Sequence, residues 1–306
     1  MADETLPVPE GDPTWLPLPL GGWQDTYATL HMWAQIAGKI CLALTPRTNH
    51  WWNITFRVTS RGLTTPTMTL GDGRAMTMVF DFVEHQFLIE LSDGRCERIA
   101  LAPKSVADFY NEVMAALARL HVRVQIWTTP VEVPDPIKFT DDTTHASYDA
   151  AAAHTFWRVL VTMAPVFEHF RSSFIGKCSP VHFFWGSFDL AVTRFSGRRA
   201  PERPGADLMT REAYSHEVIS HGFWPGAGLG EPAFYAYAAP EPEGLKIAKV
   251  MPDAAYYSTT LSEFILPYEA VRTAASPSRE LMTFLESTYV AAADLARWNR
   301  DELERR

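Results

Sequence analysis

Residues 182–195 read HFFWGSFDLAVTRF, a run dominated by aromatic and aliphatic side chains. Such residues favour β-strands, and successive side chains of a strand point to opposite faces. If the run is one continuous strand, His182 shares a face with Leu190 and Val192, and Asp189 lies on the other face. The stretch therefore predicts a long strand with one face turned toward the hydrophobic core.

Helical periodicity and further alternating runs surround this strand. Apolar residues at steps of three and four predict helices that begin after Gly21-Gly22, at the capping box of Ser105, around Phe156, and at Ser276 with Pro277 in the first turn. Alternation predicts further strands at residues 52–58, 76–82, 87–91, 95–101, 122–126, 216–223, 233–238 and 263–266. Strands and helices that follow one another in this way indicate an α+β fold, with antiparallel sheets and packed helices.

The second half of the chain repeats features of the first. In each half, a helix rich in aromatic residues precedes a His-aromatic-aromatic string, His50-Trp51-Trp52 or His182-Phe183-Phe184, and then a strand. This parallel suggests an internal duplication of an α-β(n)-α unit. We expect a flexible, acidic, Pro-rich arm at 1–20, a first half at 21–127, a Pro-rich linker at 128–145 and a second half at 146–306, together forming one compact unit.

The composition excludes several classes of protein. The chain has 306 residues, of which 47% are hydrophobic, so it can bury a large core and is not a disordered tail. Its net charge of −9 and dispersed arginines argue against a nucleic-acid partner. No run of apolar residues is long enough to cross a membrane, and the acidic start is unlike a signal peptide. Three cysteines without a CxxC pair fit a reducing compartment. We expect a soluble, cytoplasmic protein, and the oligomeric state is left open.

Four residues are candidates for catalytic chemistry: His182, His216, Glu217 and Asp189. A histidine at the start of a core-facing strand can act as a general base or ligand, or can be a hydrogen-bonded structural group. A carboxylate in an aromatic strand is costly unless it is paired. Asp189 therefore either pairs with an arginine at the sheet edge, or orients a histidine or acts as a base with a raised pKa.

Six further residues are candidates for ligand binding: His50, Trp52, Trp185, Arg194, Arg198 and Trp224. The arginines would recognise an anionic group, and the tryptophans would form pocket walls. The HExxH zinc motif is absent, because His216 and His221 are five residues apart. A metal site built from distant histidines remains an alternative, and the cofactor is unknown.

Several longer strings give the chain a recognisable signature. They are NHWW at 49–52, RGLTT at 61–65, SPVHFFWGSFD at 179–189, RFSGR at 194–198, YSHEV at 214–218 and GFWPG at 222–226. In these strings the sequence resembles an uncharacterised bacterial protein family, a domain of unknown function numbered 5996, from about Leu20 to the C-terminus. The resemblance implies one unit of about this length and no established activity or cofactor.

The function best suited to these residues is an enzyme that acts on a small molecule in an aromatic-lined pocket with His, Glu and Asp acid–base groups. The alternative from another class is a non-catalytic small-molecule-binding or sensor module, in which the histidines do not converge. A structural or partner-binding protein is a third interpretation, and it would present an exposed apolar patch.

Overall fold

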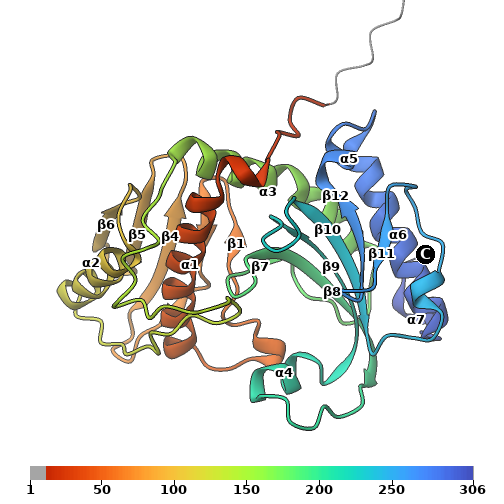
Figure 1. Ribbon diagram of the computed structural model, residues 1–306. Helices are drawn as coiled ribbons and strands as arrows, with labels where there is room; N and C mark the ends of the chain where they lie inside the picture. The colour runs from red at the N-terminus through yellow and green to blue at the C-terminus, as the bar shows by residue number, and fades with distance from the viewer. Residues whose placement is uncertain (1–11, 306) are drawn as a thin grey trace, which may run out of the picture.

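The first half of the computed structural model, which describes residues 12–305, is a sheet packed against two helices (Figure 1). The helices are α1 (Gln24–Leu44) and α2 (Val106–Arg119), and short 3-10 turns lie at η1 (Leu20–Gly22) and η2 (Asn49–Trp51). The strands are β1 (Arg57–Val58), β2 (Gly62–Thr64), β3 (Met68–Thr69), β4 (Ala75–Asp81), β5 (Gln86–Leu91) and β6 (Cys96–Ala100). They pair antiparallel in the order β1-β2-β4-β5-β6, with β3 also on β4.

Aromatic side chains hold these layers together. Phe80 of β4 and Phe87 of β5 are cross-strand partners, and both contact Phe109 of α2. Trp33 of α1 stacks on Phe109 with ring centroids 4.6 Å apart. The sheet face, α2 and α1 therefore share one core.

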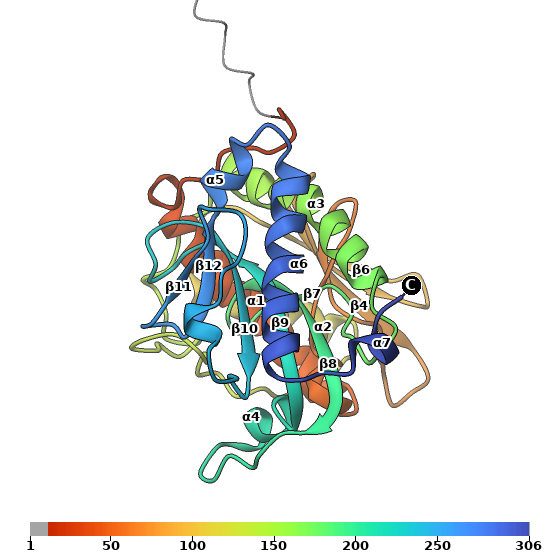
Figure 2. The same ribbon diagram turned by 90° about the vertical axis from the view of Figure 1, so that its right-hand side faces the viewer.

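The second half places a second antiparallel sheet against α3 and α6 (Figure 2). Its strands are β7 (His182–Phe184), β8 (Asp189–Arg199), β9 (His216–Trp224), β10 (Ala233–Ala239), β11 (Tyr256–Ser258) and β12 (Glu263–Pro267), in the order β11-β12-β10-β9-β8-β7. Its helices are α3 (Ala150–Ser172), α4 (Leu208–Ala213), α5 (Tyr268–Arg272), α6 (Pro277–Leu295) and α7 (Arg300–Leu303), with a 3-10 turn η3 (Leu245–Ile247).

The two sheets meet at their edge strands. The Phe56 N–H donates to the Phe183 carbonyl at 2.8 Å, and the Phe183 N–H donates to the Phe56 carbonyl at 2.9 Å. α1 is buried nearly all around because it lies between the halves: Tyr27 contacts Phe188 of the second half while Trp33 contacts the first. One continuous hydrophobic core accordingly includes residues of both halves.

The structure confirms the predicted α+β class with antiparallel sheets. Ser105 caps α2 by accepting the Asp108 N–H at 3.0 Å, and α6 begins at Pro277 after Ser276, as the sequence predicted. The Asp93-Gly94 turn joins β5 to β6. The internal duplication stays a prediction.

The predicted strand at 182–195 is wrong in one respect that matters for function. It is a hairpin, because the chain turns back between β7 and β8 and Phe188 adopts a left-handed φ of 60°. His182 pairs with Ala191, and Phe184 pairs with Asp189. Cross-strand partners share a face, so Asp189 lies on the same face as His182 and not on the opposite one.

Two other expectations also differ from the structure. Residues 52–58 do not form one strand, because η2 occupies 49–51, His50 has a φ of 55°, and pairing is confined to β1 and to the isolated bridge of Phe56 with Phe183. Residues 122–126 form no strand. The division into arm, halves and linker stays a prediction; in the segment expected to be a linker, Phe139 and Asp142 are fully buried. Of the expected arm, residues 1–11 lie outside the described part of the chain, while Trp15 and Leu18 are buried in the core.

Within residues 12–305, no helix combines the length and apolar character needed to cross a membrane.

Candidate functional site on the inner face of the second sheet

The second sheet has two different faces. On one face, Arg194 and His221 contact Phe170 of α3, and His221 also reaches Thr288 of α6. The other face, here called the inner face, is turned toward α1 and the first half. Its members follow from the strand register and include His182, Phe184, Asp189, Ala191, Thr193, Phe195, Val218, Ser220, Gly222, Trp224, Tyr235 and Tyr237.

His182 is the most unusual residue on the inner face. Its exposure is 0%, yet neither ring nitrogen forms a hydrogen bond with any described residue. The ring is packed edge-on against Phe184 at 5.6 Å and Trp52 at 6.0 Å between centroids. A buried polar group without a partner costs about 1–3 kcal/mol. Such a group in a folded protein needs an explanation, and a bound molecule is one.

Asp189 is buried on the same face at 6% exposure. Its carboxyl group accepts hydrogen bonds from the Ser187 and Tyr235 hydroxyl groups. Burial raises the pKa of Asp189, although these two hydrogen bonds act in the opposite direction. Tyr235 reaches across from β10 because its partner on the intervening strand β9 is Gly222, which has no side chain to block the ring.

Two glutamates are near enough to Asp189 for its charge to raise their pKa values. Glu132 is positioned by α1: the Gln35 side chain donates to the Val131 carbonyl at 2.7 Å and accepts the Val131 N–H at 2.8 Å. The Glu132 carboxyl group lies where a side chain at Gly186 would otherwise project. Burial, followed by the charge of Asp189, raises the pKa of Glu132.

Glu263 approaches from β12. Burial and the nearby Asp189 raise its pKa to about 7. We call Asp189, Glu132 and Glu263 the carboxyl cluster. Within residues 12–305, none of the three forms an ion pair with a lysine or arginine.

Hydroxyl and aromatic side chains extend the inner face on either side of the cluster. Thr193 and Ser220 hydroxyl groups lie 2.8 Å apart, and the Tyr237 hydroxyl group lies 3.1 Å from that of Tyr214 at the end of α4. Trp224 interacts through its indole with the Tyr27 hydroxyl group of α1. The face therefore combines carboxyl, hydroxyl, imidazole and aromatic groups.

His50 and His216 lie at the far end of the inner face. His50 donates from Nδ1 toward the Glu212 and Ala213 carbonyls at 3.1 and 3.2 Å, and Lys177 donates to its Nε2 at 2.6 Å. The His216 ring centroid is 5.9 Å from that of His50. Both His50 nitrogens are thus engaged, and its burial together with the Lys177 charge lowers its pKa.

Glu217 and Arg198 lie apart from His182. They form an ion pair at 2.7 Å, and Arg198 also donates to the Ala296 and Arg297 carbonyls. Because Glu217 is adjacent to Val218 in β9, it points to the face opposite His182. The structure does not bring Glu217 together with His182 and Asp189.

Arg194 and Trp185 are held in the protein core. Arg194 is 2% exposed and packs on the Phe170 and Tyr289 rings, where burial lowers its pKa to about 10. The Trp185 indole donates to the Ile54 carbonyl at 2.8 Å and lies against Gly38 of α1. Neither side chain lies on the inner face.

Sequence reasoning missed Glu132, Glu263 and Tyr235. Glu132 falls in the segment expected to be a linker, and Glu263 and Tyr235 look like ordinary strand residues. Tyr235 and Tyr237 alternate with alanines in β10, which was the one available sign that a polar face exists there. Only the packing of α1 and β12 brings the carboxylates together.

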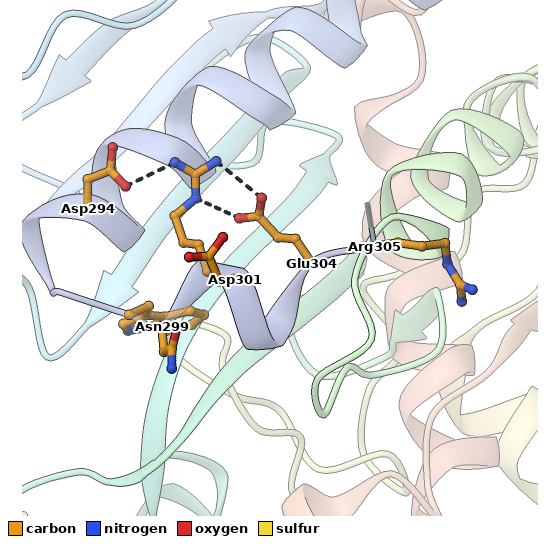
Figure 3. Close-up of a pocket in the computed structure, with 7 residues that line it drawn as sticks. Asp294, Asn299, Asp301, Glu304 and Arg305 are labelled. Carbon is orange, nitrogen blue, oxygen red and sulfur yellow. Dashed lines mark hydrogen bonds and ion pairs between the residues drawn. The ribbon is translucent and has the colours of Figure 1, made fainter.

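Two pockets lie away from His182 and the carboxyl cluster and contain little that indicates chemistry. A pocket of about 530 Å³ lies at the C-terminal end and is lined by Asp294, Trp298, Asn299, Arg300, Asp301, Glu304 and Arg305 (Figure 3). Its Arg300 is paired with Asp294 at 3.0 Å and with Glu304 at 2.6 Å. Glu217 borders a smaller pocket of about 170 Å³. Across the described chain, no three His, Cys, Asp or Glu residues are grouped so that they could hold a metal ion.

The fold and this face define an α+β protein with two joined antiparallel sheets, one of which carries a polar and aromatic face. The chain belongs to DUF5996, a family of unknown function, whose model matches residues 15–305. This confirms the resemblance seen in the sequence strings. No curated protein and no solved structure matches the chain.

Proposed function

We propose that this protein is an enzyme that binds a small molecule on the inner face, with His182 and Asp189 as its acid–base groups. The observation that carries the proposal is the fully buried His182, whose ring nitrogens have no partner among the described residues. A group of this kind is stabilised when a ligand supplies the missing hydrogen bond. His182 lies opposite Ala191, so Asp189 and Thr193 are its diagonal neighbours, at a typical spacing of about 7–8 Å.

The surrounding groups suit proton transfer. A general acid or base works best when its pKa is near the working pH, and burial brings the pKa of Glu263 to about 7. Burial likewise raises the pKa of Asp189. Perturbed carboxyl groups gathered on one face are typical of catalytic sites. Trp52 and Trp224 serve as walls for the bound molecule.

The cellular setting in this proposal is the bacterial cytoplasm. Cys41, Cys96 and Cys178 are all thiols, in keeping with a reducing compartment. The partner is a small molecule and not a nucleic acid, since the net charge is −9.

One observation favours the second candidate, a non-catalytic binding or sensor module. Catalytic histidines are usually oriented by a hydrogen bond to their second nitrogen, and no described residue provides one to His182. The two Asp189 oxygens are occupied by Ser187 and Tyr235. A ring of this kind can bind a ligand without activating it.

Thermal-shift screening followed by mass spectrometry separates the two candidates. The wild-type protein is screened against amino acids, amines, sugars, nucleosides and carboxylic acids, and the hits are repeated with His182→Leu and Asp189→Asn. The matched control is Glu97→Gln, which removes a carboxylate on the first sheet that is paired with Arg119 at 2.8 Å. We expect at least one hit that is lost in both site variants and retained in the control.

The hit is then incubated with wild-type protein and its mass is followed. Conversion of the hit by the wild-type protein, retained in Glu97→Gln, supports the enzyme. Binding without conversion supports the sensor module. If every hit survives both site variants, the inner face is not the binding site and both candidates fail.

A further inference from the structure

The carboxyl cluster is an uncompensated concentration of acid inside the protein. Asp189, Glu132 and Glu263 come from β8, the segment before α3, and β12, and each carries a pKa raised chiefly by burial. The charge of Asp189 contributes to the shift of both glutamates. Bringing carboxylates together in this way costs stability unless a cation compensates them.

Basic side chains of this region are engaged elsewhere. Lys177 donates to His50 at the far end of the inner face and lies over the Phe195 ring at 4.9 Å. Arg203 lies over the Tyr214 ring at 4.1 Å. The protein therefore supplies no ion-pair partner to the carboxyl cluster from residues 12–305.

His182 is an independent sign that a ligand belongs here. It is fully buried without a hydrogen-bond partner, and it lies on the inner face, diagonal to Asp189 across the β7–β8 pair, with its ring against Phe184 and Trp52. An imidazole nitrogen can accept an N–H from a ligand. The aromatic rings of Tyr235 and Tyr237 stack at 6.1 Å on the same face, and aromatic rings attract cations.

We propose that the molecule held on the inner face carries an organic ammonium group, and that this group lies against the carboxyl cluster among the tyrosine rings. The inference rests on the proposed function and names its ligand class. A metal ion fits less well, because the described residues include no group of three side chains placed to ligate one. An anionic ligand would face repulsion from Asp189, Glu132 and Glu263.

Three probes of similar size and different charge test the inference. They are 2-phenylethylamine, 2-phenylethanol and phenylacetate, each titrated calorimetrically near pH 8, about where the amine is still protonated and ordinary carboxyl groups are ionised. We expect the amine to bind with a Kd at least about tenfold lower than either of the others. Glu263→Gln and Asp189→Asn should each raise the amine Kd by about three- to tenfold, whereas Glu97→Gln should leave it within about twofold.

The outcomes separate the ligand class from the site itself. If the alcohol or phenylacetate binds as tightly as the amine, and this binding is lost in His182→Leu, the ammonium inference is wrong while the proposed site stands. If amine binding is unchanged in Glu263→Gln and Asp189→Asn, the carboxyl cluster is not where the ammonium lies and the inference is overturned. If no probe binds in a way that depends on His182 or Asp189, the inference fails and the proposed function loses its support.

Discussion

The phenol ring of Tyr235 lies directly over the backbone of Gly222, its cross-strand partner on β9. A Cβ atom at Gly222 would be 2.4 Å from the Tyr235 Cζ atom, well inside van der Waals contact. The ring occupies this space so that its hydroxyl group can donate to Asp189 on β8. Position 222 therefore requires a glycine, because the Tyr235 ring lies over its backbone.

Gly222→Ala should displace Tyr235 and weaken its hydrogen bond to Asp189. Forcing an extra methyl group into a packed site typically costs about 1–3 kcal/mol, and we expect that loss in the free energy of unfolding measured with urea. Gly71→Ala is the control, since a Cβ atom there meets nothing within 4 Å; its stability should change by less than about 0.5 kcal/mol. Equal stability of the two variants would show that Tyr235 does not occupy this position in solution.

Glu263→Gln should change how stability depends on pH. The pKa of Glu263 is raised from 4.5 to about 7 in the folded protein, so between these values the folded state binds more protons than the unfolded state. The contribution of Glu263 is therefore fully present below about pH 4.5 and is lost as pH rises through about 7. Full loss would amount to about 3 kcal/mol.

The measurement is urea unfolding of both proteins at intervals from about pH 5 to pH 8. Asp189 and Glu132 also have raised pKa values and act in the same direction in both proteins, so the difference between the two curves isolates Glu263. Glu263 is also faced by Tyr235, Tyr237 and Tyr257, which stay protonated over this range. We expect the variant to gain stability relative to wild type as pH rises. Parallel curves would contradict the raised pKa.

His182→Leu should stabilise the protein without ligand by about 1–2 kcal/mol, because it removes a buried polar ring that has no partner. The same change should abolish ligand binding at the inner face. Thermal unfolding and the ligand screen together check both expectations. A gain in stability with a loss of binding is what a functional residue produces.

His221→Leu is the matched control for this prediction. His221 is also fully buried in the second sheet, but on the opposite face, where its Nε2 lies 3.1 Å from the Thr288 hydroxyl group. We expect the His221→Leu variant to be less stable than the wild type or nearly as stable, and to bind the ligand as the wild type does. If His182→Leu instead destabilises the protein by more than about 2 kcal/mol, the His182 ring has a structural role.

Trp185→Phe should destabilise the protein by about 2–4 kcal/mol. It removes the hydrogen bond from the indole to the buried Ile54 carbonyl and leaves space beside Gly38 of α1. Trp127→Phe serves as control, because Trp127 is 68% exposed, and it should change stability by less than about 0.5 kcal/mol. Urea unfolding checks both. A small effect at Trp185 would mean that its contacts with the Ile54 carbonyl and with α1 are not important for stability.

Part of the candidate site could be predicted from the sequence. His182, Asp189, Trp52 and Trp224 were identified as site candidates, and the structure places Trp52 near His182 and the other two on the inner face with it. The face of Asp189 relative to His182 was predicted wrongly, because the alternation was read across a turn that strand propensity does not reveal. The Phe188 backbone adopts a left-handed conformation, which the surrounding aromatic residues gave no reason to expect.

Glu132 and Glu263 could not have been found in this way. Glu132 reaches the site through the bond between Gln35 and Val131, whose residues are 96 positions apart in the chain. Glu263 reaches it because β12 pairs with β10. A single sequence does not show which distant residues come together, because its local periodicity indicates only which side chains of each segment are buried.

The sequence by itself determined the elements and the class of fold. Helix caps such as Ser105 and the alternation in β4 are local properties, because they depend on residues that are close to one another in the chain. The tertiary structure decided which side chains meet. The turn before Asp189, the ring of Tyr235 over Gly222 and the approach of the two glutamates all depend on packing between distant segments, where burial raises the pKa of the carboxyl groups and leaves His182 without a partner.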